Sequence, residues 1–244
     1  NFLLYYQPQY YAGNRKLRGV EALIRWKDGN GRMISPAKFI PIAEKNGTII
    51  PIGNWVLEQS IRTFSEWRNR YGVPFVLSVN ISALQYQKED FVETLLNIIH
   101  KYDVDPDEIE LEITESILID DFSVVTEKMQ LLKEYGIRIS LDDFGTGNSS
   151  LSLALELPFD ELKVDMSFIR DIKQKPQNQA MVQSIVDYAR RTNTETCIEG
   201  IEDKEVSDYI EKFGSTWQQG YYYSKPVPIE QFEEVLREKA TEKE

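Results

Sequence analysis

Residues 109–114 read Ile109-Glu110-Leu111-Glu112-Ile113-Thr114, in which apolar and polar side chains alternate without a break. Successive side chains of a strand point to opposite faces, so this period of two predicts a strand with one apolar and one polar face. The same division recurs in residues 75–81, where Ser78 and Asn80 share the polar face. The fold must therefore accommodate a polar face on strand after strand.

Eight strand-like stretches with helical patterns between them run along the chain of 244 residues. A (β/α)8 barrel and a doubly wound open sheet both fit this order of elements. The barrel is favoured because its outward strand faces pack on helices and its inward faces converge on a site. The expected strands are residues 2–10, 19–25, 75–81, 109–114, 137–141, 161–164, 196–199 and 216–219. Clear helical patterns cover residues 51–71, 89–102, 122–135 and 177–191.

The first two strands are expected to run antiparallel, because only the short turn of residues 11–16 joins them. The other strands follow helices and should be parallel to one another. The predicted fold is a modified TIM (β/α)8 barrel with one antiparallel strand.

Composition and charge restrict the classes of function. With 41% hydrophobic and 28% charged residues, residues 1–244 are expected to form a single globular domain. The chain opens on Asn1 and enters a strand at once, which predicts a module excised from a longer multidomain protein. No apolar run approaches the ~20 residues of a membrane span. The net charge of −12 argues against binding to duplex nucleic acid and against direct membrane contact.

Any metal in this chain must be held by oxygen, because one cysteine and one histidine cannot build a zinc site of thiolates and imidazoles. On a single strand, a polar face is best explained as the solvent side of an antiparallel sheet. Acidic residues at the late ends of several strands instead favour a barrel mouth, where they would repel one another without a cation. Such oxygens suit Mg²⁺ or Mn²⁺, including a two-metal site. The candidate ligands are Glu21, Asn80, Glu112, Asp142, Asp143 and Glu199.

Two cations share the inward parity of these ligands. Lys163 is suited either to orient an attacking water or to serve as a structural ion-pair partner, and parity does not decide between them. Arg25 is suited either to bind a phosphate oxygen or to lie on the surface at a strand end. The Gly-rich turn after Asp142 and Asp143 is weak evidence alone, but the paired aspartates favour a functional loop.

Ordered motifs extend from Tyr6-Gln7-Pro8 to Ser224-Lys225-Pro226 and include Glu21-Ala22-Leu23. Together they resemble the EAL family of cyclic di-GMP phosphodiesterases over essentially the whole chain. The other segments that carry the resemblance are residues 35–41, 78–82, 111–116, 142–150, 162–165, 199–202 and 219–221.

The resemblance implies hydrolysis of one phosphodiester bond of cyclic di-GMP to linear pGpG, with Mg²⁺ or Mn²⁺. It implies that Lys163 and Glu199 place the catalytic water and that Glu115 ties down the loop after the paired aspartates. It also implies that Gln7, Arg25 and Gln219 belong to the substrate site. The metal-site residues that it implies are Glu21, Asn80, Glu112, Asp142, Asp143 and Asp165.

Three positions differ from the family pattern. Asn148 replaces the usual Tyr in a loop that couples metal binding to dimer contacts, so it is expected to affect coupling or metal affinity. Ile198 replaces a small Ala and has outward parity, which indicates a packing role. Trp217 lies in an atypical stretch, and we expect it to be core rather than a base-stacking surface.

A catalytic phosphodiesterase and a non-catalytic cyclic di-GMP receptor remain alternative functions, with an enzyme for another phosphodiester as a third. The full set of ligand types favours the phosphodiesterase. The resemblance further implies a homodimer. We expect the domain in the cytoplasm, also where its parent protein is attached to a membrane.

Overall fold

The computed structural model describes residues 1–114, 116–117, 122–145 and 157–241. Within these ranges no helix has the length and apolar character needed to cross a membrane. The strands are β1 (Phe2–Tyr11), β2 (Leu17–Lys27), β3 (Met33–Ile34), β4 (Val76–Asn80), β5 (Ile109–Thr114), β6 (Arg138–Phe144), β7 (Glu161–Val164), β8 (Glu195–Ile198) and β9 (Trp217–Gln218). The α-helices are α1 (Pro36–Lys45), α2 (Ile49–Tyr71), α3 (Ala83–Tyr86), α4 (Phe91–Lys101), α5 (Phe122–Glu134), α7 (Met166–Ile169), α8 (Pro176–Thr192), α9 (Lys204–Ile210) and α10 (Ile229–Thr241), with 3-10 turns at Pro106–Glu108 and Glu211–Phe213.

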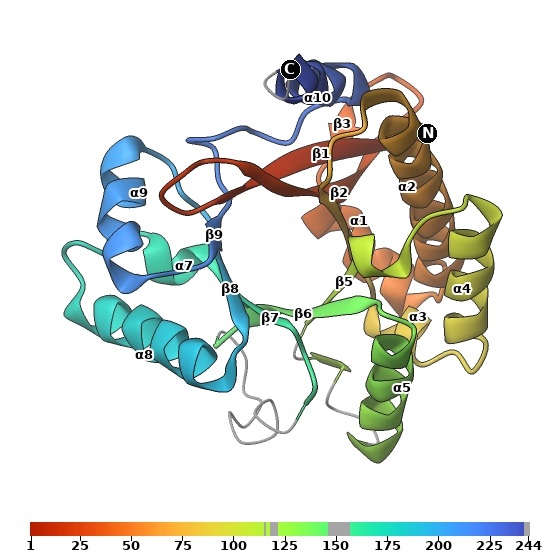
Figure 1. Ribbon diagram of the computed structural model, residues 1–244. Coiled ribbons are helices and arrows are strands. Elements are labelled where there is room, and N and C mark those ends of the chain that lie inside the picture. The colour runs from red at the N-terminus through yellow and green to blue at the C-terminus, as the bar shows by residue number, and fades with distance from the viewer. Residues whose placement is uncertain (115, 118–121, 146–156, 242–244) are drawn as a thin grey trace.

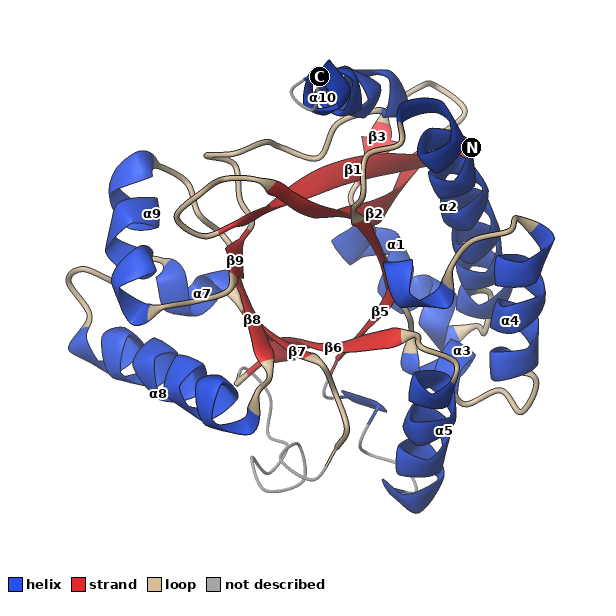
Figure 2. Cartoon of the chain, viewed as in Figure 1, coloured by secondary structure: helices blue, strands red, loops and turns tan. Residues whose placement is uncertain are grey.

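The strands close into a barrel with the helices outside it (Figures 1 and 2). Around the ring the order is β1-β9-β8-β7-β6-β5-β4-β2, and pairing of β1 with β2 closes it. Strand β1 is antiparallel to both of its neighbours, whereas the pairs from β2 round to β9 are all parallel. This confirms the predicted modified TIM barrel. The short strand β3 pairs with the end of β2 outside the ring, and the sequence patterns did not predict it.

The outward strand faces form the main core against the helices. Leu111 and Leu162 on the strands and Leu57 on α2 are fully buried in one continuous cluster. Helix α2 runs for 23 residues and ends at Gly72, whose left-handed backbone lets its N–H bond to Arg68 O. Ile198, with its outward parity, lies in the same core, as expected.

The inverted strand β1 has no helix between it and β2, so another element must cover its outer face. Helix α10, from the far end of the chain, lies there together with α2 (Figure 1). The ring of Tyr6 contacts Trp67 edge to face at 4.7 Å between centroids and stacks on Phe232 at 6.2 Å. The first strand is thus fixed by aromatic packing that joins both ends of the chain.

The inward strand faces are polar, and they form two layers inside the barrel. The upper layer lies at the ends of the parallel strands and comprises Gln7, Glu21, Asn80, Glu112, Asp142, Lys163, Glu199 and Gln219. The lower layer lies one inward position deeper and comprises Gln9, Arg18, Ser78, Glu110, Glu161 and Trp217.

Candidate active site

The upper layer gathers predicted site residues around one ammonium group. Lys163 Nζ lies 2.7 Å from Glu112 Oε2 and 2.8 Å from Glu199 Oε1. The same atom lies 3.4 Å from Asp142 Oδ1 and 4.0 Å from Glu21 Oε2. Five residues that are far apart in the sequence therefore meet because the parallel strands all end at the same rim.

This cluster carries more negative charge than its one ammonium can balance. Burial raises the pKa of Glu112 well above its usual value, and the charge of Glu21 raises it further. Burial also raises the pKa of Glu199 to about 8. Burial and neighbouring carboxylates thus disfavour the charged forms of Glu112 and Glu199.

Lys163 itself is held in its charged form. Burial opposes the charge, but Asp142, Glu112, Glu199 and Glu21 outweigh burial and raise the pKa of Lys163 well above its usual value. A group with such a pKa donates hydrogen bonds and does not act as a general base. The geometry shows Lys163 as an ion-pair partner of the surrounding carboxylates, and its role toward an attacking water stays a prediction.

Glu21 differs from its neighbours because amide groups hold both of its oxygens. Asn80 Nδ2 donates to Oε1 at 2.7 Å, and Gln219 Nε2 donates to Oε2 at 2.6 Å. Burial would raise the pKa of Glu21, but Lys163 and these two hydrogen bonds outweigh it, and the pKa is lowered. Glu21 is thus an ionised carboxylate whose plane is fixed.

The donor set fits a hard divalent cation. Glu112 Oε1 is buried and has no hydrogen-bond partner among the described residues. One carboxylate oxygen of the cluster is therefore left without a donor or a cation beside it. The group as a whole offers carboxylate and amide oxygens, which Mg²⁺ and Mn²⁺ prefer. Within the described ranges no three acidic, histidine or cysteine side chains are already arranged as a metal cage, and Lys163 lies between the carboxylates instead.

Comparisons with known proteins identify the family. The family model described as "EAL domain" matches residues 1–226. The chain belongs to the EAL domain family. Its Glu21-Ala22-Leu23 motif lies on β2, and the first of these residues is the doubly hydrogen-bonded carboxylate of the upper layer.

Relatives of this EAL domain include signalling proteins and named enzymes. The signaling protein YkoW of Bacillus subtilis is 35% identical over 99% of this chain and 30% of its own length. The cyclic di-GMP phosphodiesterase PA2567 of Pseudomonas aeruginosa is 35% identical over 97% of this chain and 40% of its own length. This chain therefore spans well under half the length of the curated relatives it matches.

Among solved structures, the PaMucR phosphodiesterase in complex with c-di-GMP matches with a TM-score of 0.90 and 35% identity, covering 95% of this chain and 94% of that one. The EAL domain of DcpA from Mycobacterium smegmatis matches with a TM-score of 0.82 and 27% identity, over 97% of this chain and 96% of that one. These likenesses agree with the barrel described above.

The other predicted site residues surround the upper layer. Gln7 accepts a hydrogen bond from Gln219 and donates to Ser224 O at 3.1 Å. Asp165 caps α7, accepting from Ser167 N at 3.0 Å, and lines the same cavity as Asp142 and Glu199. That cavity measures about 310 Å³ and also includes Met166 and Tyr221.

Asp143 and Arg25 lie at the edge of the site. Asp143 has a left-handed backbone with φ of 56°, and its N–H bonds to Asp142 Oδ1 at 2.9 Å. The guanidinium of Arg25 is half-buried, donates to Ile24 O and lies 5.5 Å from the centre of the Tyr5 ring. Glu115 and Asn148 lie outside the described residues.

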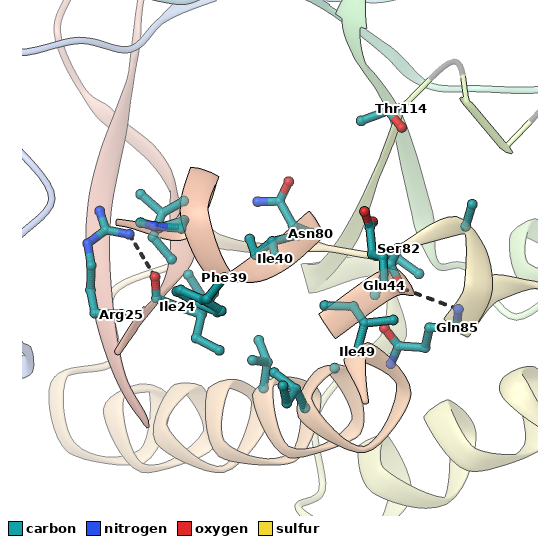
Figure 3. Close-up of a pocket in the computed structure, with 18 of the residues that line it drawn as sticks. Ile24, Arg25, Phe39, Ile40, Glu44, Ile49, Asn80, Ser82, Gln85 and Thr114 are labelled. Atoms are coloured by element: carbon teal, nitrogen blue, oxygen red, sulfur yellow. Dashed lines mark hydrogen bonds between the residues drawn. The ribbon is translucent and has the colours of Figure 1, made fainter. Parts of the chain in front are cut away.

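A second, apolar hollow also has Glu21 in its lining. It measures about 300 Å³ and shares Glu21 and Leu23 with the first cavity. Figure 3 shows Arg25 at one end of this hollow and Gln85 at the other, with Phe39, Ile40 and Ile49 between them. Two hollows therefore meet at Glu21 and Leu23.

The lower layer contains residues that the sequence patterns did not assign to any site. Arg18 bonds to both oxygens of Glu110 and to Glu161 Oε2, and its guanidinium lies 4.1 Å from the centre of the Trp217 ring. Trp217 Nε1 donates to Glu161 Oε1 at 3.0 Å, so this tryptophan is interior packing, as expected.

Arg18 points inward because of a bulge in β2. Gln9 pairs with Gly19 and Tyr10 with Leu17, which leaves Arg18 as an extra residue out of the alternation. A Cβ on Gly19 would lie 2.7 Å from Val76 O, so a glycine is required at this close approach. The glycine within a strand pattern is the sequence signal for such a bulge.

Proposed function

We propose that this EAL domain is a divalent-metal-dependent phosphodiesterase that hydrolyses cyclic di-GMP to linear pGpG. The observation that carries the proposal is the excess of carboxylates around Lys163, two of them buried, including an oxygen of Glu112 without a hydrogen-bond partner among the described residues. A site of this kind attracts divalent cations and, through them, a phosphate group. The names of relatives such as PA2567 and PdeR support the substrate.

The upper layer would provide the metal ligands. Bound divalent ions supply charge neutralisation at phosphate and lower the pKa of a coordinated water. The residues that would hold them are Glu21, Asn80, Glu112, Asp142, Asp143 and Asp165, with Glu199 beside the water.

This chain's own residues would bind and orient the other groups. Lys163 stays protonated and donates a hydrogen bond from Nζ toward the attacking water or toward a phosphate oxygen. Arg25 presents a forked donor at the rim, which suits a phosphate oxygen, and Gln7 is held in place by Gln219. In the reaction, water oxygen bonds to phosphorus, the bond from phosphorus to the ribose O3′ breaks, and that oxygen receives a proton.

The two hollows support a substrate with two bases on either side of one reacting phosphodiester. Both include Glu21 in their lining, and the second is lined by the apolar side chains of Phe39, Ile40 and Ile49. A purine face can lie against such a surface while the hydrogen-bonding edge meets polar groups such as Ser82 and Gln85. We assign one guanine to each hollow.

The deciding experiment is incubation of the purified chain with cyclic di-GMP and Mg²⁺ or Mn²⁺, followed by chromatography of the nucleotides. The expected result is formation of pGpG that stops when the metal is chelated and is abolished in Lys163→Met. Linear pGpG and an aryl phosphodiester serve as competing substrates, and faster turnover of either would contradict the assigned specificity. Binding of cyclic di-GMP without turnover would instead identify a receptor.

We propose that the active form is a homodimer, that the domain is a module of a longer protein, and that it acts in the cytoplasm. Mass measurement of the chain in solution, with and without Mn²⁺, tests the first of these.

A further inference from the structure

One chain of hydrogen bonds connects the two layers inside the barrel. Arg18 Nη1 donates to Gln9 Oε1 at 2.9 Å, and Gln9 Nε2 donates to Gln219 Oε1 at 3.1 Å. Gln219 Nε2 then donates to Glu21 Oε2 at 2.6 Å. All four side chains are buried. The chain begins at a structural cation and ends at a proposed metal ligand.

The direction of every bond in this chain is fixed by its two ends. Arginine offers only donors and an ionised carboxylate only acceptors, whereas each glutamine amide has one donor group and one acceptor. Gln9 must therefore turn its oxygen to Arg18 and its NH₂ group to Gln219. Gln219 must in turn use its oxygen for Gln9 and its NH₂ group for Glu21. A flip of either amide would bring two donors together at one of its bonds and two acceptors together at the other.

The starting point of the chain is rigid. Arg18 is held by both oxygens of Glu110, by Glu161 and by the face of Trp217. The bulge that turns Arg18 inward is backed by the close contact at Gly19, which leaves no room for another side chain. An anchored guanidinium thus sets the orientation of two amides above it.

We propose that Arg18 and Gln9 are positioning residues of the metal site, which act through Gln219 to hold the Glu21 carboxylate in the orientation that receives a cation. The inference rests on the proposed function, because Glu21 is a ligand only if the domain binds metal. Asn80 bonds to the other oxygen of Glu21, so the relay supplies the second of two supports for one carboxylate plane. Neither Arg18 nor Gln9 would touch metal or substrate.

The test is the affinity of the nucleotide-free chain for Mn²⁺, measured by electron paramagnetic resonance of the free ion. Gln9→Met keeps the length of the side chain and removes both hydrogen bonds. Gln219 Oε1 then loses its donor, and only the bonds from Gln219 Nε2 to Gln7 and Glu21 remain. Outer-layer supports of metal ligands typically contribute 10–100-fold, and we expect Mn²⁺ affinity to fall roughly 10-fold. Unchanged affinity would overturn the proposal.

Gln218→Met is the matched control. Gln218 is as fully buried as Gln9 and is the neighbour of Gln219, but it faces outward and bonds to Ser207 and Tyr223. We expect it to lose stability without losing Mn²⁺ affinity. An equal loss of affinity in both variants would mean that any buried glutamine has this effect, which would overturn the specific role of Gln9.

A double-variant comparison separates positioning from general structural damage. If Gln9 acts through Gln219, Gln9→Met has no further effect on Mn²⁺ affinity in a Gln219→Met background. If the double variant instead loses Mn²⁺ affinity by the product of the two single-variant factors, the relay is contradicted. Should Gln9→Met not fold, Gln9→Glu preserves the pair with Arg18 and can only accept from Gln219. Weaker Mn²⁺ binding despite the added negative charge supports the relay, and equal or tighter binding overturns it.

The same preparations distinguish this inference from the proposed function. Intact Mn²⁺ binding without hydrolysis of cyclic di-GMP in the unsubstituted chain rejects the phosphodiesterase and leaves the relay standing. Hydrolysis together with unchanged Mn²⁺ affinity in Gln9→Met rejects the relay alone. An unsubstituted chain that binds no Mn²⁺ overturns both.

Discussion

Glu110 and Glu112 lie two residues apart on β5, face the same interior and are both buried. Their pKa values are nevertheless shifted in opposite directions. Burial favours a raised pKa for Glu110, but the charge and hydrogen bonds of Arg18 outweigh burial and lower the pKa to about 2. Burial raises the pKa of Glu112, and the nearby Glu21 raises it further. The supply of cations, and not depth in the barrel, makes the difference.

The contrast extends to the two layers. In the lower layer, Glu110 and Glu161 meet the guanidinium of Arg18, and Arg138, at the start of β6, reaches Glu110 from the opposite end of the barrel. In the upper layer, four carboxylates lie within 4.0 Å of the single ammonium of Lys163. Even in the lower layer, burial and the charge of Glu110 raise the pKa of Glu161 well above its usual value, so the two layers differ in the degree of their charge imbalance. The upper layer thus has the larger excess of carboxylates over cations, which suits the cation site proposed for it.

Removal of the cation from each layer should produce the largest difference. We expect Arg18→Met to reduce the free energy of unfolding by about 3–5 kcal/mol, because Glu110 and Glu161 lose their buried partner. Lys163→Met should cost less in the presence of Mn²⁺, since a bound ion can supply the missing charge. Urea unfolding followed by circular dichroism measures both. Equal losses with Mn²⁺ present would show that the layers do not differ in this way.

Neutralising one glutamate in each layer should separate stability from function. Glu110→Gln should lower the free energy of unfolding by roughly 1.5–3 kcal/mol, the value of a hydrogen bond to a charged group. It should weaken Mn²⁺ binding by no more than the roughly 10-fold expected for Gln9→Met, because Glu161 and Trp217 still hold Arg18. Glu112→Gln should reduce hydrolysis of cyclic di-GMP by roughly 100-fold or more, yet leave metal-free stability unchanged or higher. Urea unfolding and nucleotide chromatography give the two readouts. Loss of Mn²⁺ binding in Glu110→Gln would remove the distinction.

A smaller effect is expected in the pH dependence of stability without metal. Glu199 loses its proton near pH 4.5 when unfolded but only near pH 8 when folded, so the folded chain holds more protons between these values. Stability therefore falls as pH rises through this window. Glu110, with its pKa lowered to about 2, contributes stability that is lost as pH falls below 4.5. Urea midpoints across pH measure both slopes.

Two controls assign the upper slope. Glu199→Gln should flatten the fall between pH 4.5 and pH 8, because the group whose pKa is raised to about 8 is then absent. Saturating Mn²⁺ should flatten it as well, since a cation replaces the bound proton. A slope that survives in Glu199→Gln would assign it to another group.

The alternation of side chains predicted the barrel and most of the upper layer, because a period of two fixes which side chains face inward. It gave Glu110, Glu112, Glu161 and Lys163 the correct face. It did not predict that the deeper acids are neutralised, since depth depends on the stagger between strands that are distant in sequence. One strand by itself carries no information about that stagger.

Arg18 shows where the alternation fails. Counted from Glu21, strict alternation places Arg18 on the outer face, and only the bulge in β2 turns it inward. Its neighbour Gly19 is the local sign of the bulge, but a glycine in a strand does not reveal which residue is extra. The short elements β3, α3 and α7 were also missed, because two to four residues are too few to show a period.

The reversed direction of β1 also determines where the chain enters the barrel. Phe2 pairs with Trp26 near the end of β2, and the amino group of Asn1 bonds to Lys27 O, so residue 1 lies at the rim that carries the upper layer. A first strand parallel to the others would start at the opposite rim. In longer relatives, a segment preceding this point would be attached directly to the strand that carries Gln7. The entrance of the chain and Gln7 thus lie on one strand, which the packing of Tyr6 on Trp67 and Phe232 holds in place.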